Sequence, residues 1–403
     1  MGPTSAAVMA TPNPITNEEG VATSVRAIST SGKLAFVDAL RGVAALMVIA
    51  CHVAYIPSPN LTASPPLLRL INAGQSGVVL FFMVSAFTLC LSFEVRKSNF
   101  TITQTRNYFL RRLFRILPLF LISIPIAWLR DLVVYSYPRP LYQTLTSGIS
   151  SLIPNNYQGL VWASWTLNIE LLFYLIFPLV FRICNSMRRA LLGLAACIFA
   201  DVTASILMES TTRRAISLNF TEIRNSTLMH LDNDIRFSIL HNLQFFMLGI
   251  VFYYFYRDYV TAGTISKKVG RLLLVVGISV FALFVLYGPR SIDTVLHGRN
   301  LFIGITLLIF IFGCSIHAPR LFVNRWTTSL GIISYSLYLL HPPLIAFFFR
   351  FYSRIYSPAI PATASYLICL MLTLAILIPI SALSFRYIEK PGIALGKNLI
   401  SRL

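Results

Sequence analysis

The chain has 403 residues, of which 56% are hydrophobic and only 12% are charged, and its mean hydropathy is +0.72. This composition excludes an ordinary soluble globular protein and predicts a polytopic membrane protein. The net charge of +19 does not indicate a nucleic-acid binder, because basic residues in a membrane chain usually mark cytoplasmic loops and contacts with anionic head groups.

The first part of the chain, residues 1–33, is rich in Ser, Thr, Ala and Pro and lacks the apolar core of a secretory signal. Such a composition cannot bury enough apolar surface to fold, so it predicts a disordered cytoplasmic tail. Residues 34–403 are then expected to form one transmembrane domain.

Ten apolar runs are long enough to span a bilayer, which predicts an all-α transmembrane bundle. They cover residues 36–56, 76–93, 113–134, 165–181, 190–208, 238–256, 271–287, 300–317, 329–349 and 364–385. With the N-terminus placed inside, the inner segments carry 21 of the 33 Lys and Arg residues and the outer segments 11. The positive-inside rule therefore predicts that both termini are cytoplasmic. A bacterial inner membrane is the expected location, in preference to a eukaryotic endomembrane.

The first run holds an arginine and a histidine at membrane depth, Arg41 and His52. Ionisable residues inside a span are costly, so each is a candidate site residue. Eleven residues turn a helix about 20° beyond three full turns, which places both side chains on one face, about 16 Å apart. One groove can therefore contain both groups.

The second run begins with Gly74 and Gly77 and contains Ser85. This pattern predicts close helix packing through small residues and a contribution to a cavity wall. At the start of the third run stand Arg111, Arg112 and Arg115. Guanidinium groups match phosphate oxygens, so this cluster is a candidate site for a phosphorylated cytoplasmic donor. Anchoring to anionic lipid is the alternative.

The fourth run contains Trp165 and Glu170, and the ninth contains Tyr338 and His341. A carboxylate inside the membrane must be paired, so Glu170 is expected to face the bundle interior, whereas Trp165 fits an interfacial aromatic belt. From the topology we expect Glu170, His341 and His52 to reach one depth, which favours an active site over scattered structural residues.

The remaining polar residues are less informative. Asp201 also lies at membrane depth, and the sequence leaves open whether it pairs with a cation or bonds to Thr and backbone groups. The six cysteines show no C-x-x-C spacing, so we expect packing residues and no metal site.

These patterns together resemble the acyltransferase 3 family of integral membrane O-acyltransferases, which includes glycan, Nod-factor and macrolide acylases. The resemblance covers about residues 36–390. It rests on Arg-x10-His at Arg41 and His52, Arg-x-x-Arg at Arg112 and Arg115, Trp-x-Leu-x-x-Glu ending at Glu170, Ser-Tyr-Ser-Leu-Tyr-Leu-x-His ending at His341, and Phe-Arg-Tyr-Ile-Glu389-Lys-Pro391. One departure is Ser85-Ala86-Phe87, where the family usually has Ser-Gly-Phe.

The resemblance implies transfer of an acyl group, with acetyl expected, from acyl-coenzyme A to a hydroxyl of a sugar-containing or lipid-linked acceptor. His52 is the expected general base, Arg41 steadies the donor or polarises its thioester, and Glu170 orients His52. Arg111, Arg112 and Arg115 are expected to hold the donor phosphates. The other candidates, close to the site or on the acceptor side, are His341, Tyr338, Ser85 and Trp165.

Several alternatives remain open at this stage. No bound cofactor is expected, because acetyl-coenzyme A acts as a co-substrate. The donor and the acceptor are expected to reach the site from opposite faces of the membrane, and direct transfer and an acyl-histidine intermediate are both compatible with the residues. A proton-coupled transporter or a lipid-glycan flippase is the second functional hypothesis, in which the same residues bind a substrate without catalysis.

Overall fold

The computed structural model describes residues 34–58, 60–95, 101–137, 140–150, 152, 161–217, 237–288, 298–356 and 359–403. The tail expected over residues 1–33 lies outside these ranges. Throughout the described part every regular element is a helix and no strand is present, which confirms the all-α prediction.

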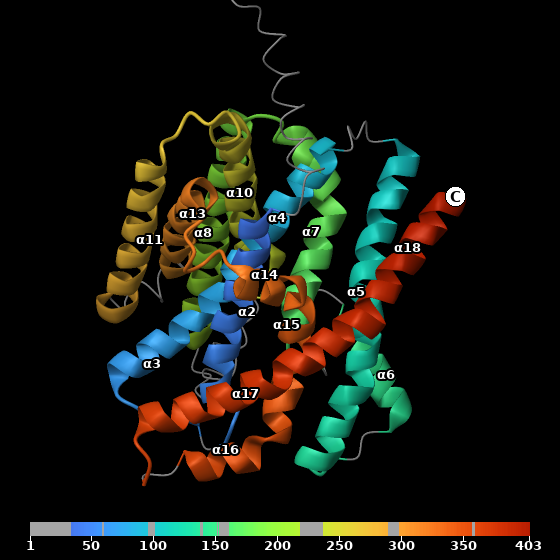
Figure 1. The fold of residues 1–403 in the computed structure, drawn as a ribbon, viewed down its shortest axis with the longest axis vertical. Coiled ribbons are helices and arrows are strands. Elements are labelled where there is room, and N and C mark those ends of the chain that lie inside the picture. Colours follow the sequence, from blue (N-terminus) through green and yellow to red (C-terminus); the bar gives the residue numbers. More distant parts are fainter. Residues whose placement is uncertain are drawn as a thin grey trace, which may run out of the picture.

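Nine helices of the described residues are long and apolar enough to cross a membrane, which confirms a multi-pass membrane protein. The main spans are α2 (Ala35–Tyr55), α4 (Gly77–Val95), α5 (Ile102–Val134), α7 (Ser164–Ile183), α8 (Met187–Ser217), α10 (Ile239–Phe255), α11 (Lys267–Tyr287), α13 (Gly298–His317) and α17 (Ala362–Ser384). Figure 1 shows most of them standing side by side, with the first span near the middle of the bundle.

The expected ninth span, 329–349, is not a single straight helix. It consists of α14 (Arg325–Ile332) and α15 (Ser334–Phe347), which meet at an angle of 74°. The backbone leaves the helical region between them, at Ile333 (φ −98°, ψ 11°). Asn324 starts α14 with a capping box, in which its side chain accepts from the Thr327 backbone and the Thr327 hydroxyl accepts from the Asn324 backbone. The count of ten spans holds only if this bent pair is taken as one.

The expected tenth span, 364–385, is part of a much longer rod. α17 continues through a π-helical turn, η3 (Phe385–Glu389), into α18 (Lys390–Arg402). These 41 residues extend about 60 Å at 1.5 Å per residue, which is about twice the thickness of the hydrocarbon layer. Figure 1 shows the rod in red, running obliquely across the bundle to the C-terminus. The buried carboxylate of Glu389 accepts a hydrogen bond from Ser336, which fixes the rod to α15.

Helix α2 is held by backbone contacts on two sides. A Cβ added to Gly331 of α14 would lie 1.7 Å from the carbonyl oxygen of Asp38, so these two helices touch without intervening side chains. At Gly77 the same addition would meet the Ala44 oxygen at 2.4 Å. The predicted small-residue packing at the start of the second span is therefore confirmed. These contacts fix the helix that carries Arg41 and His52.

The remaining elements are short and lie between the spans. They are α3 (Pro65–Asn72), the 3-10 turn η1 (Ala73–Ser76), α6 (Leu141–Ser150), the π-helical turn η2 (Tyr256–Val260) and α16 (Phe349–Ile355). Aromatic rings fill much of the interior, including a stacked pair, Phe173 and Phe246, whose centroids are 3.9 Å apart.

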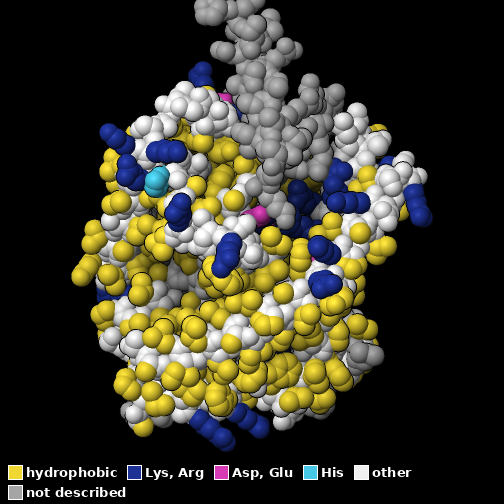
Figure 2. Space-filling model, in the orientation of Figure 1, with side chains coloured by type: hydrophobic (Ala, Val, Ile, Leu, Met, Phe, Trp, Pro, Cys, Tyr) yellow, Lys and Arg dark blue, Asp and Glu magenta, His cyan; other side chains and the backbone are white. Residues whose placement is uncertain are grey.

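Charge is distributed unevenly over the surface. In Figure 2, Lys and Arg side chains gather over the upper part of the visible face, and a hydrophobic band covers most of the area below them, with a few basic residues at the lower edge. In Figure 1 the N-terminal ends of α2 and α5 and the C-terminal end of α18 lie toward this upper part, which we call the basic end.

Candidate active site

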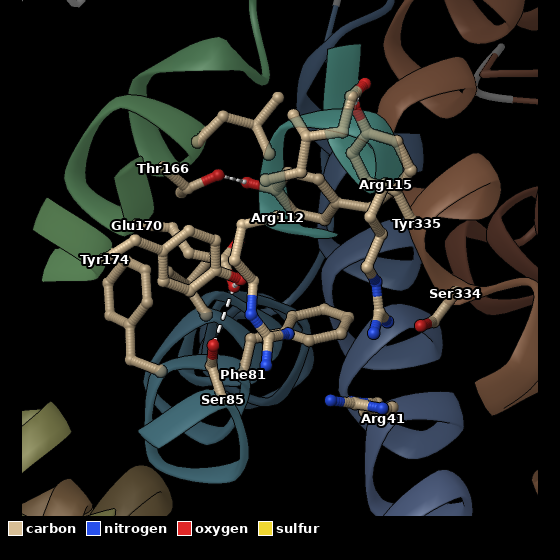
Figure 3. A pocket seen from close by; sticks show the side chains of 15 residues that line it. Arg41, Phe81, Ser85, Arg112, Arg115, Thr166, Glu170, Tyr174, Ser334 and Tyr335 are labelled. Atoms are coloured by element: carbon tan, nitrogen blue, oxygen red, sulfur yellow. Dashed lines mark hydrogen bonds between the residues drawn. The ribbon is translucent and has the colours of Figure 1, made fainter. Parts of the chain in front are cut away.

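A cavity with an empty volume of about 720 Å³ lies among five helices. α2, α4, α5, α7 and α15 each contribute side chains to it, and Figure 3 shows these side chains pointing toward a common space. The polar and charged residues that line it are Arg41, Ser85, Arg112, Arg115, Thr166, Glu170, Tyr174, Ser334, Tyr335 and Tyr338. Apolar walls complete it, mainly Val78, Phe81 and Leu167.

Three arginines meet in this cavity. Arg41 lies 3.8 Å from the Asp38 carboxylate and donates a hydrogen bond of 3.1 Å to the Thr88 hydroxyl. The guanidinium carbon of Arg112 lies 5.4 Å from the centre of the Tyr174 ring, a cation–π contact. Arg115 faces the same space from the next turn of α5 (Figure 3). Arg111, by contrast, is not among the lining residues.

The cavity therefore carries excess positive charge. Among the described residues, no carboxylate lies within 4.0 Å of Arg112 or Arg115. Arg112 and Arg115 are partly buried, and a partly buried cation without a partner is stabilised by an anion that binds beside it. A phosphorylated ligand would supply that anion and would match the fork of donors on each guanidinium.

Glu170 shares this cavity but is hydrogen-bonded to neutral groups. Ser85 donates a bond of 2.7 Å to Oε1, drawn in Figure 3, and the Tyr174 hydroxyl donates to the same oxygen. Tyr108 in turn donates to the Tyr174 carbonyl at 3.1 Å. The carboxylate is thus fixed by α4 and α7, and these contacts do not involve His52.

The two histidines form a pair of their own. His341 Nε2 lies 3.0 Å from His52 Nδ1, and the ring centroids are 4.9 Å apart. His52 Nδ1 also lies 3.1 Å from the carbonyl oxygen of Val48. Since a carbonyl can only accept, we assign the proton of His52 to Nδ1, where both the carbonyl and the His341 lone pair can receive it. The Nε2 atom of His52 is then left with a free lone pair.

Tyr338 connects the cavity to the histidine pair. It lines the cavity, its ring centroid lies 5.6 Å from that of His341, and its hydroxyl is 2.9 Å from the Thr166 hydroxyl. The Phe81 ring meets Tyr338 edge-on at 5.6 Å. Tyr338, in contact with Phe81, is therefore the residue that links the arginine cavity to the histidine pair.

The hydrogen bonds of Glu170 are to Ser85 and Tyr174, and the two histidines bond to each other, so the structure does not bring Glu170 into contact with the histidine pair. Glu170 lines the arginine cavity with Arg41, whereas His52 follows Arg41 by eleven residues, or about 16 Å along α2. The reason lies in the start of α7: this helix begins at Ser164, so Thr166 is the residue that meets Tyr338 and Glu170 lies one turn further in.

Other expected site residues lie in separate places. Ser85 and Tyr338 line the cavity, but Trp165 does not, and its ring packs against Phe237 at 4.6 Å. The sequence analysis gave no role to Tyr174, Tyr335 or Thr166, although all three line the cavity. Thr166 and Tyr174 each lie four residues from Glu170, and Tyr335 lies three residues from Tyr338. This helical spacing places them on the same faces as the predicted site residues and could have identified them.

The buried carboxylate of Asp201 pairs with a histidine outside the cavity. Its two oxygens each lie 3.1 Å from His241 Nδ1, and Gln244 donates to one of them at 3.1 Å. Asp201 thus contacts His241 and Gln244, which were in neither of the alternatives that the sequence left open. In the described part of the chain, no group of three or more His, Cys, Asp or Glu residues is arranged to hold a metal ion.

Comparison with known proteins gives consistent results. O-acetyltransferase OatA of Staphylococcus aureus is 25% identical over 349 residues, which are 80% of this chain and 53% of that protein. Acyltransferase MdmB of Streptomyces mycarofaciens is 31% identical over 186 residues, 42% of this chain and 45% of that protein. A putative acetyltransferase of Acidianus two-tailed virus is 23% identical over 310 residues, 75% of this chain and 80% of that protein.

The chain spans about half the length of the first two of these relatives. No solved structure gave a significant match. The bacterial relatives and the span-length helices agree with a multi-pass protein of a bacterial membrane. The family model for an acyltransferase domain matches residues 34–382, which is most of the chain. The protein therefore belongs to the acyltransferase 3 family.

Proposed function

We propose that this protein transfers an acyl group, acetyl in the simplest case, from acyl-coenzyme A to a hydroxyl group of a sugar-containing or lipid-linked acceptor. The observation that carries the proposal is one cavity in which three arginines meet, with a histidine pair just beyond Tyr338. Family membership and the names of the relatives, O-acetyltransferase and acyltransferase, support the same reaction.

The arginines form the donor site in this proposal. Coenzyme A carries several phosphates, and Arg112 and Arg115 offer guanidinium groups with no carboxylate partner among the described residues. Arg41, held by Asp38, steadies the donor. It does not polarise the thioester at the histidines, because the distance along α2 to His52 is about 16 Å.

The donor enters from the basic end, which is cytoplasmic by the positive-inside rule (Figure 2). Its phosphates remain at the arginines while the long pantetheine arm passes between Phe81 and Tyr338 toward the histidines. The acceptor arrives from the opposite end, where α2 ends at Tyr55, three residues after His52. Donor and acceptor thus meet inside the membrane from opposite sides.

His52 is the general base, and His341 orients it. The free Nε2 atom of His52 takes the proton of the acceptor hydroxyl, while Nδ1–H is held by the Val48 carbonyl and His341. This arrangement follows the logic of a base fixed by a second group, with an imidazole in the place of the usual carboxylate. Glu170 has a different role and shapes the donor cavity through Ser85 and Tyr174.

The acyl transfer needs only the acceptor alcohol, the thioester and His52, and no further reactant. The acceptor oxygen forms a bond to the thioester carbonyl carbon as its proton moves to His52. In this proposal the Tyr338 hydroxyl, which lies between the cavity and His341, donates to the oxygen that becomes negative in the tetrahedral intermediate. The carbon–sulfur bond then breaks, and the leaving thiolate takes the proton from His52 to become free coenzyme A.

The test uses the purified full-length protein in lipid nanodiscs with acetyl-coenzyme A and a panel of glycoside and glycolipid acceptors. Acceptor-dependent thiol release that requires His52 is the expected result. A single turnover with radiolabelled acetyl-coenzyme A and no acceptor should leave no label on the protein, whereas retained label would indicate a covalent intermediate. Substrate movement across liposomes without any thiol release would overturn the proposal in favour of a transporter.

A further inference from the structure

A second hollow lies on the other face of α2. It has an empty volume of about 1120 Å³ and is bounded by α2, α3, η1, α11, α13 and α17. We call it the lateral groove. On α2 its wall is formed by Val43, Met47 and Ala50, which follow one stripe of the helix. Ala50 precedes His52 by two residues, or 200° of helical rotation, so the groove and the arginine cavity lie on nearly opposite faces of α2.

The side chains of the lateral groove offer no free hydrogen-bond donor to an occupant. Its lining is apolar except for two hydroxyl groups, Thr306 and Tyr366. Thr306 donates its proton to the Ile303 carbonyl at 2.8 Å, and Tyr366 donates to the Ala50 carbonyl at 3.0 Å. Both protons are therefore used within the protein. A polar ligand would lose its contacts with water and find only two hydroxyl oxygens as acceptors, so the groove favours a hydrocarbon chain.

A cation lies beside this groove. Leu67, Leu70 and Ile71 of α3 line it, and Arg69 of the same helix donates to the Leu286 carbonyl at the end of α11. That bond uses one of five guanidinium donors. Among the described residues no carboxylate lies within 4.0 Å of Arg69. An anionic group at the end of the hydrocarbon chain would therefore find a complementary charge here.

The groove also lies near His52 in the sequence, because Ala50, which lines it, precedes His52 by two residues. Tyr366 closes it by bonding to Ala50, and α2 ends at Tyr55, only three residues beyond His52. A head group attached to a chain in the groove needs to pass only this short end of α2 to reach His52 on the other face.

We propose that the lateral groove binds the hydrocarbon chain of a phosphate-linked lipid that carries the acceptor hydroxyl, with its phosphate at Arg69 and its polar head group at His52. The proposal rests on the function proposed above and narrows the acceptor to a lipid-linked one. It assigns separate faces of α2 to the two substrates, so donor and acceptor bind without competing for space.

The first test maps the groove with a probe of this chemistry. The full-length protein in phosphatidylcholine nanodiscs is labelled by light with a farnesyl phosphate that carries a diazirine on its chain. The expected result is labelling of peptides that contain Met47, Leu67 and Ile278, which unlabelled farnesyl phosphate prevents. Labelling spread evenly over the lipid-facing helices would show that the groove holds bulk lipid only and would overturn the proposal.

Matched variants separate the groove from its surroundings. Ile278→Trp fills it and should reduce labelling at least about tenfold, the loss expected when two methylenes or more are displaced. Leu283→Trp adds the same side chain to α11 at a residue that is 58% exposed and outside the lining, and it should leave labelling unchanged. Arg69→Gln should weaken competition by farnesyl phosphate but not by farnesol. Equal behaviour of the two tryptophan variants would contradict the proposal.

Binding of acetyl-coenzyme A is measured in the same samples. It should be unchanged in Ile278→Trp, because the arginine cavity lies across α2. A wild-type protein that fails to bind acetyl-coenzyme A would argue against the proposed function, whereas unspecific labelling would argue against the groove. The two failures are therefore distinguishable.

Discussion

His52 is paired with a neutral partner, which determines how it can act as a base. A carboxylate at Nδ1 would hold the ring strongly and stabilise its protonated form. The lone pair of His341 holds the same proton at 3.0 Å without adding a charge to the membrane interior. An uncharged partner avoids the cost of placing an ion in low-dielectric surroundings, and His341 itself is fully buried. The pair is thus suited to a base that must release its proton again within one turnover.

We expect His52→Ala to lower acceptor-dependent thiol release by a factor on the order of 10²–10⁴, the usual contribution of a general base. Because the arginines bind the donor elsewhere, the KM for acetyl-coenzyme A should change little. His341→Gln keeps a hydrogen-bonding group near Nδ1 and should retain more activity than His341→Ala. The control is His317→Ala at the end of α13, outside the site. Full activity of His52→Ala would contradict the mechanism.

The arginines can be tested by removing their fork geometry while keeping their charge. Arg112→Lys and Arg115→Lys should each raise the KM for acetyl-coenzyme A about tenfold, since a lysine cannot bind two phosphate oxygens in parallel. Arg111→Lys is the matched control, because Arg111 does not line the cavity. A similar rise in KM for all three variants would indicate a general surface effect in place of a defined donor site.

Single residues in this chain were easier to predict than their partners. Spacing on one helix was enough to place Arg41 and His52 on one face, and Arg112 and Arg115 together on another. The partner of each group depends on which turn of a neighbouring helix stands at the same height. On α7 the residue that meets Tyr338 is Thr166, which precedes Glu170 by four residues, or about one turn.

At the scale of the helices, the crossing of α2 and α14 sets the position of Arg41. Gly331 touches the backbone of Asp38, and Gly42 touches that of Thr327, where an added Cβ would lie 2.2 Å from the oxygen. The same Asp38 pairs with Arg41. Displacement of α14 therefore moves the guanidinium directly.

Gly331→Ala should separate the two helices, because the new methyl carbon would stand 1.7 Å from a backbone oxygen that cannot rotate away. Overpacking of this kind costs about 1–3 kcal/mol. We expect a lower midpoint of thermal unfolding in detergent together with weaker binding of acetyl-coenzyme A. Gly304→Ala is the control, since its nearest neighbour, at 3.0 Å, is the mobile end of Leu248. Unchanged donor binding in Gly331→Ala would contradict this coupling.

The bend between α14 and α15 could not be predicted from the hydropathy of the sequence. The run 329–349 is apolar enough overall to read as one span, and its hydropathy does not mark Ile333 as the residue where the helix turns by 74°. The bend comes from tertiary contacts: α14 is pressed against α2 at Gly331, and Tyr335 donates to the Ile116 carbonyl of α5 at 2.8 Å. Contacts between distant segments cannot be derived from the local pattern.

Over the whole molecule, the apolar runs predicted nearly every span, because hydrophobic length is a local property of the sequence. Hydrophobic length does not determine which end of the bundle faces the cytoplasm, and this orientation is predicted from the distribution of Lys and Arg. Figure 2 shows Lys and Arg gathered at the basic end, and the positive-inside rule predicts that such an end faces the cytoplasm. The N-terminal end of α5, the helix that carries Arg112 and Arg115, and the C-terminal end of α18 lie toward it (Figure 1).

Cysteine labelling tests this orientation. Ser401→Cys near the C-terminus and Thr62→Cys between α2 and α3 are both exposed positions at opposite ends of the bundle. A membrane-impermeant maleimide added to intact cells should label Thr62→Cys and should reach Ser401→Cys only after the membrane is opened. Background is low, because five of the six native cysteines are buried. The reverse pattern would place the arginine cavity on the outer side.

The closeness of the two imidazole rings has one more consequence. Two imidazolium cations with nitrogens 3.0 Å apart would repel strongly. The neutral pair can therefore take up only one additional proton. The pair must lose this extra proton in each catalytic cycle before His52 can accept a proton from another alcohol. In the proposed mechanism, acid on the side from which the alcohol arrives therefore protonates the pair and halts turnover, whereas coenzyme A stays bound because guanidinium groups keep their charge.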